Sequence, residues 1–388
     1  MLARTLFLLL ALIATSSAMD LGIDVLRGRG FDVLQGKRVG LVTNQTGVDS
    51  HGTKTRMILK KAPGVKLTAL FSPEHGLDGT AQAGRYVASR KDGATGLTVY
   101  SLYGPTRKPT RAMLAGIDAL VYDMQDIGCR SYTYISTMAK CMEAAGEAGI
   151  EFIVLDRPNP LGGQRVEGPP MESSWISFVG IFPVPYVHGM TAGELAQMAN
   201  ARGWTGSRCK LTVVPMRGWS RGMTWPETGL RWVQTSPNIP HAMSPFYYVA
   251  TGLVGELHAI ECGCGGSAPF ESIRASGVDG AAMAARLRAA GYPGVSFSPV
   301  SDGVNLRISQ NAGANLCKLA AHLILEANRG ANLFARYRDP DQIFYKCYGS
   351  TSIKSHAQGG TSIDRIVAGW ESGVASFRGA RGGYLLYQ

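Results

Sequence analysis

The sequence predicts an α/β protein with a largely parallel sheet, followed by a second and smaller domain. Through the first two-thirds of the 388 residues, short β-branched runs alternate with helical stretches. Strands that alternate with helices usually pair in parallel, and helices then cover both faces of the sheet. After about Pro240, glycine and alanine become more frequent and strand-like runs fewer, so we divide the chain there. The predicted parts are a leader at residues 1–18 and domains at 19–240 and 241–388.

Hydrophobic runs and their spacing predict the individual elements. Six strands are expected at Arg38–Thr43, Lys66–Phe71, Leu97–Leu102, Ala119–Asp123, Phe152–Leu155 and Leu211–Pro215. Helices are expected at Thr53–Lys61, Ile135–Ala148, Ala192–Ala201, Ala281–Ala290 and Asn315–Asn328. The clearest signal is in the second helix, where Ile135, Met138, Met142 and Ala145 recur at intervals of three and four residues.

The first eighteen residues have the pattern of a secretion signal. Arg4 gives a positive start, Leu6–Ala14 forms an apolar core, and Ser16, Ser17 and Ala18 form a small-residue cleavage site. The core is about half of the roughly 20 apolar residues that a membrane-spanning helix needs. We therefore expect an exported protein, periplasmic or secreted, without stable membrane insertion; an uncleaved signal anchor is the alternative.

Charge and cysteine usage narrow the choice of partners and cofactors. Lys and Arg outnumber Asp and Glu by 39 to 28, but these basic residues form no long run. Scattered basic charge suits either weak attraction to anionic envelope polymers or solubility alone, and export disfavours nucleic acid. Cys262 and Cys264 form a close pair but lack the second pair that a zinc site requires. Neither a dinucleotide fingerprint nor a Walker loop appears, so no cofactor or metal is expected.

Polar residues collect where four of the predicted strands end. The loops at these ends are Asn44–Gly47, Ser72–Gly76, Met124–Arg130 and Asp156–Pro160. In an open parallel sheet, ligands bind beyond the carboxyl ends of the strands. Any single strand needs a polar exit, but four together predict a crevice that binds a polar ligand.

Glu74 is the first candidate for catalysis within these loops. It follows Pro73, which stiffens the turn, and a carboxyl held near apolar neighbours there would have a raised pKa and suit a general acid. The alternative is a carboxylate that braces the loop. His75 fits a supporting, hydrogen-bonding role better than the role of a base.

Asp126 and Arg157 are the next candidates. Asp126 forms an acidic pair with Asp123, and its alternative role is to pair with Arg130 or to cap the following helix. Arg157 suits fork-like binding of a carboxylate, although the prolines around it explain the turn by themselves.

The segment after His188 reads as the start of a helix. Thr191 and Glu194 are three residues apart and form a capping box, which is sufficient to explain both, with catalysis by Glu194 as the alternative. His188 lies just before the helix and is freer to face the crevice. Ser220 lies in a G-x-S-x-G pattern, but the residues after it do not open the helix that a nucleophile elbow needs.

Seven short motifs occur together in a fixed order. They are Leu41–Gly47, Phe71–Gly76, Tyr100–Gly104, Gln125-Asp126 with Tyr132–Tyr134, Leu155–Pro160, His188–Thr191 with Gly193-Glu194, and Thr235–Pro240. Their combination resembles the NamZ-type exo-β-N-acetylmuramidases, a family formerly known only as a domain of unknown function. The similarity runs through nearly the whole chain, to the closing Tyr384–Tyr387.

The resemblance implies a Rossmann-like amino-terminal domain, a smaller carboxy-terminal α/β domain and an active-site cleft between them. It implies release of N-acetylmuramic acid from the non-reducing ends of peptidoglycan fragments, without a nucleotide cofactor. Glu74 matches the family's Pro-Glu-His-Gly motif and is the first choice for catalysis, with Glu194 or Asp126 as its partner. The other matched positions are expected to line the substrate site: Asn44, His75, Gln125, Arg130, Tyr132, Arg157, Asn159, His188, Asn238 and Glu256.

A mechanism follows from this hypothesis. Glycoside hydrolysis usually needs two carboxyl groups on either side of the scissile bond. We expect Glu74 to act as the acid, Tyr132 to stack on a sugar face, and Arg130 or Arg157 to clamp the lactyl carboxylate of muramic acid.

One segment departs from the family's pattern. Between Glu256 and Phe270 the family's threonine, asparagine and arginine are replaced, while Glu256, Gly263 and Gly265 keep their places. This departure puts the leaving side of the substrate, or the terminal sugar itself, in question. Because of this departure, one alternative hypothesis is that the protein binds envelope sugars without catalysing a reaction. A serine esterase or amidase acting on the cell wall is the other alternative.

Overall fold

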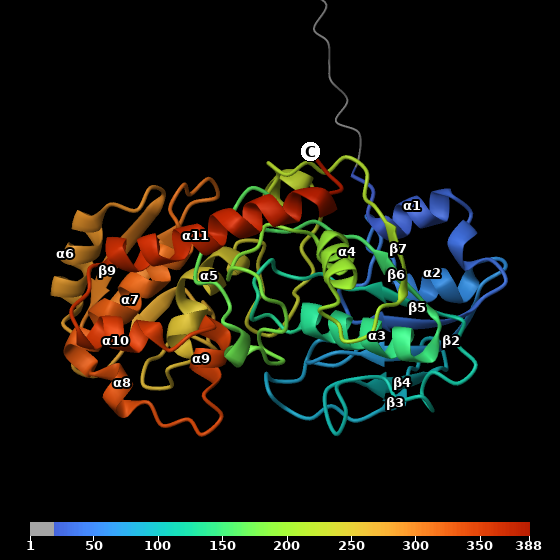
Figure 1. Cartoon of the computed structure of the whole chain (residues 1–388), viewed down its shortest axis with the longest axis horizontal. Helices are drawn as coiled ribbons and strands as arrows, with labels where there is room; N and C mark the ends of the chain where they lie inside the picture. The colour runs from blue at the N-terminus through green and yellow to red at the C-terminus, as the bar shows by residue number, and fades with distance from the viewer. Residues whose placement is uncertain (1–18) are drawn as a thin grey trace, which may run out of the picture.

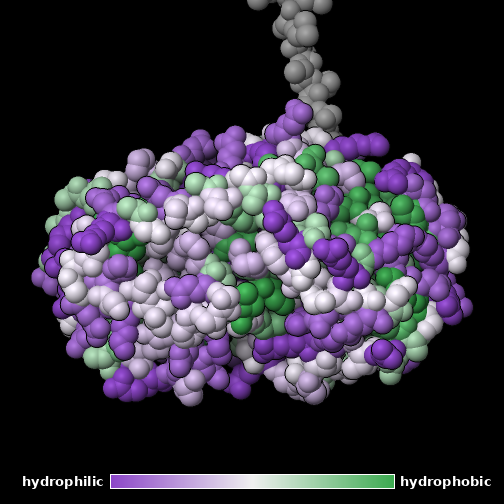
Figure 2. Space-filling view, viewed as in Figure 1, coloured by the Kyte–Doolittle hydropathy of each residue, from purple (hydrophilic) through white to green (hydrophobic). Residues whose placement is uncertain are grey.

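The structure is a computed structural model that describes residues 19–388, so the predicted signal sequence at 1–18 lies outside the described residues. The chain forms two lobes that lie side by side (Figure 1). We call residues 19–243 the sheet lobe and residues 244–388 the helical lobe. Among residues 19–388, no helix is long and apolar enough to span a bilayer. On the face in Figure 2, hydrophilic side chains are widespread and hydrophobic ones form separate patches.

The sheet lobe is built on seven strands in the order β3–β4–β2–β1–β5–β6–β7. Neighbouring strands run parallel except β3, which is antiparallel to β4 at one edge. From β1 the chain moves outward to β2 and β4, and from β5 it moves outward the other way, so the strand order reverses between β1 and β5. The strands are β1 (Arg38–Thr43), β2 (Lys66–Ser72), β3 (Arg90–Lys91), β4 (Thr98–Ser101), β5 (Ala119–Asp123), β6 (Glu151–Leu155) and β7 (Lys210–Val214).

Helices cover both faces of this sheet (Figure 1). They are α1 (Gly22–Gly28), α2 (Thr55–Lys61), α3 (Tyr134–Ala148) and α4 (Ala192–Arg202). Alternate residues of a strand point to opposite faces. In β5, Leu120 and Tyr122 therefore pack in one apolar cluster with α3 and α4, whereas Ala119 and Val121 pack in another with α1 and α2. The predicted α/β architecture is confirmed.

Local sequence explains where the two long helices of this lobe begin and end. At the start of α4, Thr191 Oγ1 accepts from the Glu194 backbone N–H at 3.2 Å, and the Glu194 carboxylate accepts from the Thr191 N–H at 3.0 Å. This is the predicted capping box. Helix α3 ends at Gly149, whose φ of 67° is left-handed and therefore favours glycine.

The helical lobe combines a small antiparallel sheet with seven helices among its described residues. Its strands, in the order β8–β10–β9, are β8 (Ser272–Arg274), β9 (Val295–Val300) and β10 (Gly303–Ile308). The helices are α5 (Ser244–Gly255), α6 (Gly280–Ala290), α7 (Leu316–Ala331), α8 (Leu333–Arg336), α9 (Ile343–Tyr348), α10 (Ser352–Gln358) and α11 (Ile363–Arg381). Short 3₁₀ turns lie at η1 (Asp32–Leu34), η2 (Ser173–Trp175), η3 (Trp225–Thr228) and η4 (Gly382–Tyr384).

The end of the chain ties the two lobes together. Helix α11 runs from the helical lobe back toward α4 (Figure 1). Arg381 at its end donates to the backbone carbonyls of Gly163 and His188, each at 3.0 Å. Beyond it, the Tyr387 hydroxyl donates to Asp156 at 2.6 Å. These bonds hold the lobes in a fixed relation, which a pocket between them requires.

Candidate active site

A pocket of about 680 Å³ lies between the two lobes. The sheet lobe contributes Glu74 and Tyr132 to its lining, and the helical lobe contributes Glu256, Cys262 and Phe270. This volume is typical of small-molecule sites. We call it the interlobe pocket.

Glu74 reaches this pocket from the loop that follows β2. Its Oε1 accepts from the Gly84 N–H at 2.8 Å, and its Oε2 accepts from the Thr133 hydroxyl at 2.7 Å. The phenol of Tyr103 is a third neighbour, and burial together with the charge of Glu74 raises the pKa of Tyr103 to about 12. The carboxylate is therefore fixed in direction by surrounding donors while it lines the pocket.

Backbone strain concentrates around the same pocket. His75, His258 and Phe270 have φ values of 67°, 57° and 67°, and all three line the interlobe pocket. Left-handed backbone is costly for residues other than glycine, and such strain gathers at functional sites. His75 also places its Nδ1 2.6 Å from the Ala81 carbonyl, which braces the loop that carries Glu74.

Glu256 lines the pocket at the end of α5, where it is the C-cap residue directly after Gly255. Burial raises its pKa to about 7, and the negative charges of Asp339 and Glu74 add to the effect. Glu256 therefore holds its proton over much of the range below neutral pH. The sequence predicted it only as a substrate-binding residue, whereas its environment is that of a buried carboxylic acid in a pocket that a second carboxyl, Glu74, also lines.

Tyr132 and Asn238 form part of the pocket wall. The Tyr132 hydroxyl donates to Thr235 Oγ1 at 2.8 Å, and its ring lies edge-on to the Tyr248 ring, with centroids 6.0 Å apart. Asn238 accepts from the Gly265 N–H at 3.0 Å, a bond that joins the two lobes. Both residues line the pocket as expected, and each also holds the wall in place.

Glu194 lies outside the pocket and is fully buried. Besides the capping bond, its Oε1 accepts from Arg221 at 2.7 Å and from the Leu386 N–H at 2.9 Å. The hypothesis that Glu194 is the second catalytic carboxyl is therefore corrected. Its oxygens accept hydrogen bonds from the start of α4, from Arg221 and from the end of the chain.

Arg130 is likewise a structural group. Its side chain is fully buried, and its two terminal nitrogens donate to four backbone carbonyls at 2.6–3.0 Å. Those carbonyls belong to Pro169, Val184, Cys347 and Tyr348. A guanidinium occupied in this way does not clamp a substrate carboxylate, so that expectation for Arg130 is corrected.

A second group of predicted residues gathers around a small buried cavity at the strand ends. The cavity measures about 10 Å³, room for a single water, and its lining includes Gln125, Asp126, Arg157, Asn159 and His188. Burial raises the pKa of Asp126 to about 7 and lowers the pKa of His188 to about 3. The structure thus brings these five residues together, but away from Glu74.

A larger cavity of about 510 Å³ opens beside this cluster, and we call it the strand-end pocket. Its lining includes Lys54, Gln125, Arg157, Trp232 and Gln234. Asn44, by contrast, is buried and uses its Oδ1 to accept from the Thr46 N–H at 2.9 Å, which shapes the loop after β1. The single predicted crevice is therefore two pockets.

The segment from residue 234 to 240 is the wall between them. Ser236, Asn238 and Ile239 line the interlobe pocket, whereas Gln234 and Pro240 line the strand-end pocket. This segment forms hydrogen bonds to Tyr132 and to Gln45 in the loop after β1. These partners are far away in the sequence, so no local pattern predicts the contacts.

Comparison with known proteins decides the family. The models for the N-terminal and C-terminal domains of exo-beta-N-acetylmuramidase NamZ match residues 39–243 and 246–387. The chain belongs to the NamZ family. The Bacillus subtilis (strain 168) protein named peptidoglycan beta-N-acetylmuramidase NamZ is 40% identical over 96% of this chain and 92% of that protein.

Two crystal structures of DUF1343 family proteins from Bacteroides fragilis NCTC 9343 have the same fold as this NamZ-family chain. One has a TM-score of 0.86 and 42% identity over 95% of this chain and 99% of its own. The other has a TM-score of 0.75 and 28% identity over 96% and 99%.

Two other arrangements do not form sites in this NamZ-family protein. Ser220 is exposed, the next helical turn begins only at Trp225, and none of the described histidines bonds to it, so the nucleophile-elbow hypothesis is wrong.

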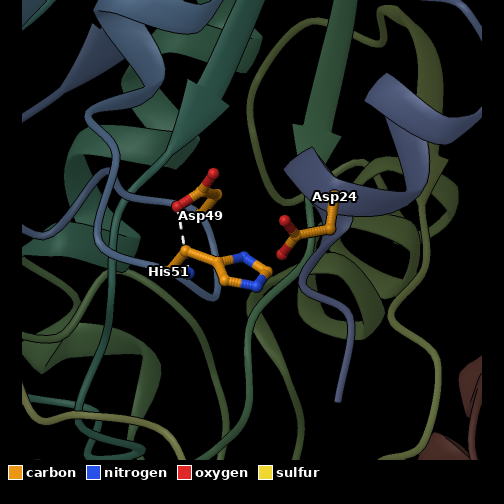
Figure 3. Close-up of side chains that lie close together, drawn as sticks. All are labelled: Asp24, Asp49 and His51. Carbon is orange, nitrogen blue, oxygen red and sulfur yellow. Dashed lines mark hydrogen bonds between the residues drawn. The ribbon is translucent and has the colours of Figure 1, made fainter. Parts of the chain in front are cut away.

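Asp24, Asp49 and His51 lie close together (Figure 3). Arg27 neutralises both carboxylates at 2.9 and 2.8 Å, and backbone N–H groups occupy them further. This trio braces loops.

The segment from Glu256 to Phe270, which the resemblance singled out, forms the helical-lobe wall of the interlobe pocket. Glu256, His258, Glu261, Cys262 and Cys264 all line it. The Sγ atoms of the two cysteines lie 3.3 Å apart. This segment therefore faces the same pocket as Glu74.

Proposed function

We propose that this protein is an exo-acting β-N-acetylmuramidase that releases N-acetylmuramic acid from the non-reducing ends of peptidoglycan fragments. Full-length similarity to the Bacillus subtilis enzyme supports this assignment. The observation that carries it is the meeting of Glu74 and Glu256 in one pocket of suitable size. Glycosidases need two carboxyl groups in different protonation states, and contrasting environments set those states.

The contrast assigns the two roles. Glu256, with its pKa raised to about 7, is the general acid that protonates the glycosidic oxygen as the bond to C1 breaks. Both oxygens of Glu74 accept hydrogen bonds that fix its direction, and we assign this carboxyl the role of stabilising positive charge at C1. Water then supplies a hydroxyl to C1 and returns a proton to Glu256. This assignment moves the acid role from Glu74 to Glu256.

The lactyl carboxylate of muramic acid needs a cation, and Arg107 is placed to provide it. Its guanidinium lies 5.1 Å from the ring centroid of Tyr103, which lines the pocket, and 4.3 Å from that of Phe178. No acidic side chain of residues 19–388 forms a salt bridge with Arg107, and the residue is exposed. A stacked guanidinium without an acidic partner, next to a tyrosine that lines the pocket, suits a carboxylate.

The proposed setting is the cell envelope. The leader pattern at residues 1–18 supports export, and the proposed partners are saccharides derived from peptidoglycan. A non-catalytic sugar-binding role is the competing function, because the wall beside Glu256 departs from the family pattern.

The test compares two disaccharides that differ in the terminal sugar. The purified protein is incubated with N-acetylmuramyl-N-acetylglucosamine or with a disaccharide that has N-acetylglucosamine at its non-reducing end, and free sugars are followed by mass spectrometry. We expect release of N-acetylmuramic acid from the first only. Binding of the first disaccharide without any product would instead support the sugar-binding role.

A further inference from the structure

The strand-end pocket occupies the place where open parallel sheets usually bind ligands. In such sheets, ligands bind outside the carboxyl ends of the strands at the point where the strand order reverses. Here that point lies between β1 and β5. Thr46 and Val48 follow β1, Gln125 follows β5, and all three line the strand-end pocket. The proposed catalytic carboxyls lie elsewhere, in the interlobe pocket, so the chemistry proposed above leaves this crevice unused.

The charges around the strand-end pocket leave a positive surplus. Asp49, the one carboxylate of the lining, binds Arg27 at 2.8 Å, and Arg157 of the lining binds Asp123 behind it at 2.5 Å. The Asp49 side chain lies beside that of His51 on this wall (Figure 3). Lys54, by contrast, forms no salt bridge among the described residues and donates only to the Gln45 carbonyl, at 2.7 Å. Burial lowers the pKa of Lys54, the positive charges of Arg56 and Arg157 add to this effect, and the negative charge of Asp78 opposes it.

The remaining lining offers an aromatic surface and an unused acceptor. Trp232 lies edge-on to Trp225, with ring centroids 4.9 Å apart, and both indole N–H groups bond to backbone carbonyls. Their apolar surfaces are therefore what remains for a ligand. Gln125 is 3% exposed, and its Oε1 accepts no hydrogen bond from the described residues. Leaving such a buried acceptor unpaired is costly, so a ligand hydroxyl or N–H suits it.

We propose that the strand-end pocket is a second ligand site, which binds a small carboxylate-bearing molecule through Lys54, Trp232 and Gln125. The site rests on the proposed function only for the choice of ligand. Peptidoglycan fragments carry carboxylates on the lactyl group of muramic acid and on the attached peptide. The pocket's volume of about 510 Å³ accommodates a monosaccharide or a dipeptide.

Tryptophan fluorescence is the direct test, because Trp232 lies in this pocket and the lining of the interlobe pocket contains no tryptophan. The full protein is titrated with N-acetylmuramic acid, with the dipeptide alanyl-glutamate, and with N-acetylglucosamine as a neutral match. We expect saturable quenching by at least one of the two carboxylate ligands, and the one that quenches identifies the source. Trp232→Phe leaves Trp225 as the one tryptophan of this lining and should therefore reduce the quenching.

The effect of removing the Lys54 charge on ligand affinity distinguishes binding in the strand-end pocket from binding elsewhere on the protein. Lys54→Met should weaken binding of the carboxylate ligand about tenfold, whereas Lys61→Met should leave its affinity unchanged, because Lys61 is an exposed lysine at the far end of α2, the helix that Lys54 precedes. Equal quenching by N-acetylglucosamine, an unchanged affinity in Lys54→Met, or no quenching by either carboxylate would overturn the proposal. None of these readouts requires turnover, so failure of the hydrolysis assay leaves this test intact.

Discussion

Glu74 and Glu256 enter one pocket from different lobes, Glu74 from the loop after β2 and Glu256 from the end of α5. Burial and the negative charge of Asp339 raise the pKa of Glu256, and the charge of Glu74 adds to this effect. The two lobes must therefore keep a fixed relative position for Glu74 and Glu256 to line the same pocket. The hydrogen bonds that Arg381 of α11 and Tyr387 make to the sheet lobe maintain that relative position.

The pH dependence of turnover should report Glu256. Its pKa is raised to about 7, so the protonated acid is present below that pH and is lost as the pH rises through it. We expect kcat/KM to fall on the alkaline side with a midpoint near pH 7. Glu256→Gln should remove this limb and lower kcat by about a hundredfold or more. Rates measured from pH 5 to 9 test this, and a wild-type profile that stays flat through pH 7 contradicts the acid assignment.

His75 should tolerate only residues that accept left-handed backbone. With φ at 67°, a β-branched side chain costs about 1–2 kcal/mol, whereas asparagine and glycine fit. We expect His75→Val to lower both thermal stability and kcat/KM, and His75→Asn to keep most of each. If His75→Asn abolishes turnover in a fully folded protein, the imidazole itself takes part in the chemistry.

Arg107 should determine the preference for muramic acid. Removing a contact made equally with substrate and transition state raises KM and leaves kcat unchanged. Arg107→Met should therefore raise KM for the muramyl disaccharide about tenfold at constant kcat. The matched variant is Arg111→Met, an exposed arginine four residues further on, which should change neither constant. An unaltered KM in Arg107→Met places the carboxylate clamp elsewhere.

Glu194 should affect stability. Breaking a buried ion pair by removing one partner costs about 3–5 kcal/mol, because the other charge stays buried. Glu194→Gln should therefore lower the free energy of unfolding in urea, and adding Arg221→Met should recover part of the loss. The kcat of the folded Glu194→Gln protein should stay near wild type. A normal stability with no turnover would return Glu194 to the catalytic candidates.

The sequence predicts much of the sheet lobe because its signals are local. All six expected strands are present, and Ala119–Asp123 and Arg38–Thr43 match at both ends. The capping box at Thr191 and the loop-supporting role of His75 also follow from neighbouring residues. The β3 edge strand has only two residues, too few to give a pattern.

The parts that escaped prediction depend on contacts between distant segments. Arg130 looks like a free guanidinium in the sequence, but its acceptors include Pro169 and Tyr348, far along the chain. The residues from 234 to 240 divide one expected crevice into two pockets, because they bond to Gln45 and Tyr132, which are distant in the sequence. Tyr103 lay within a recognised motif, whereas Arg107 had no motif to mark it, and its place beside Tyr103 appears only in the fold.

The most direct test of the central claim is the rate of N-acetylmuramic acid release from N-acetylmuramyl-N-acetylglucosamine by wild type, Glu74→Gln, Glu256→Gln and Glu261→Gln. Glu261 is an exposed carboxyl on the same pocket wall and serves as the matched control. We predict release by wild type and Glu261→Gln, and a loss of about a hundredfold or more in each of the other two variants with their folds intact. Wild-type rates in both Glu74→Gln and Glu256→Gln would contradict the two-carboxyl mechanism.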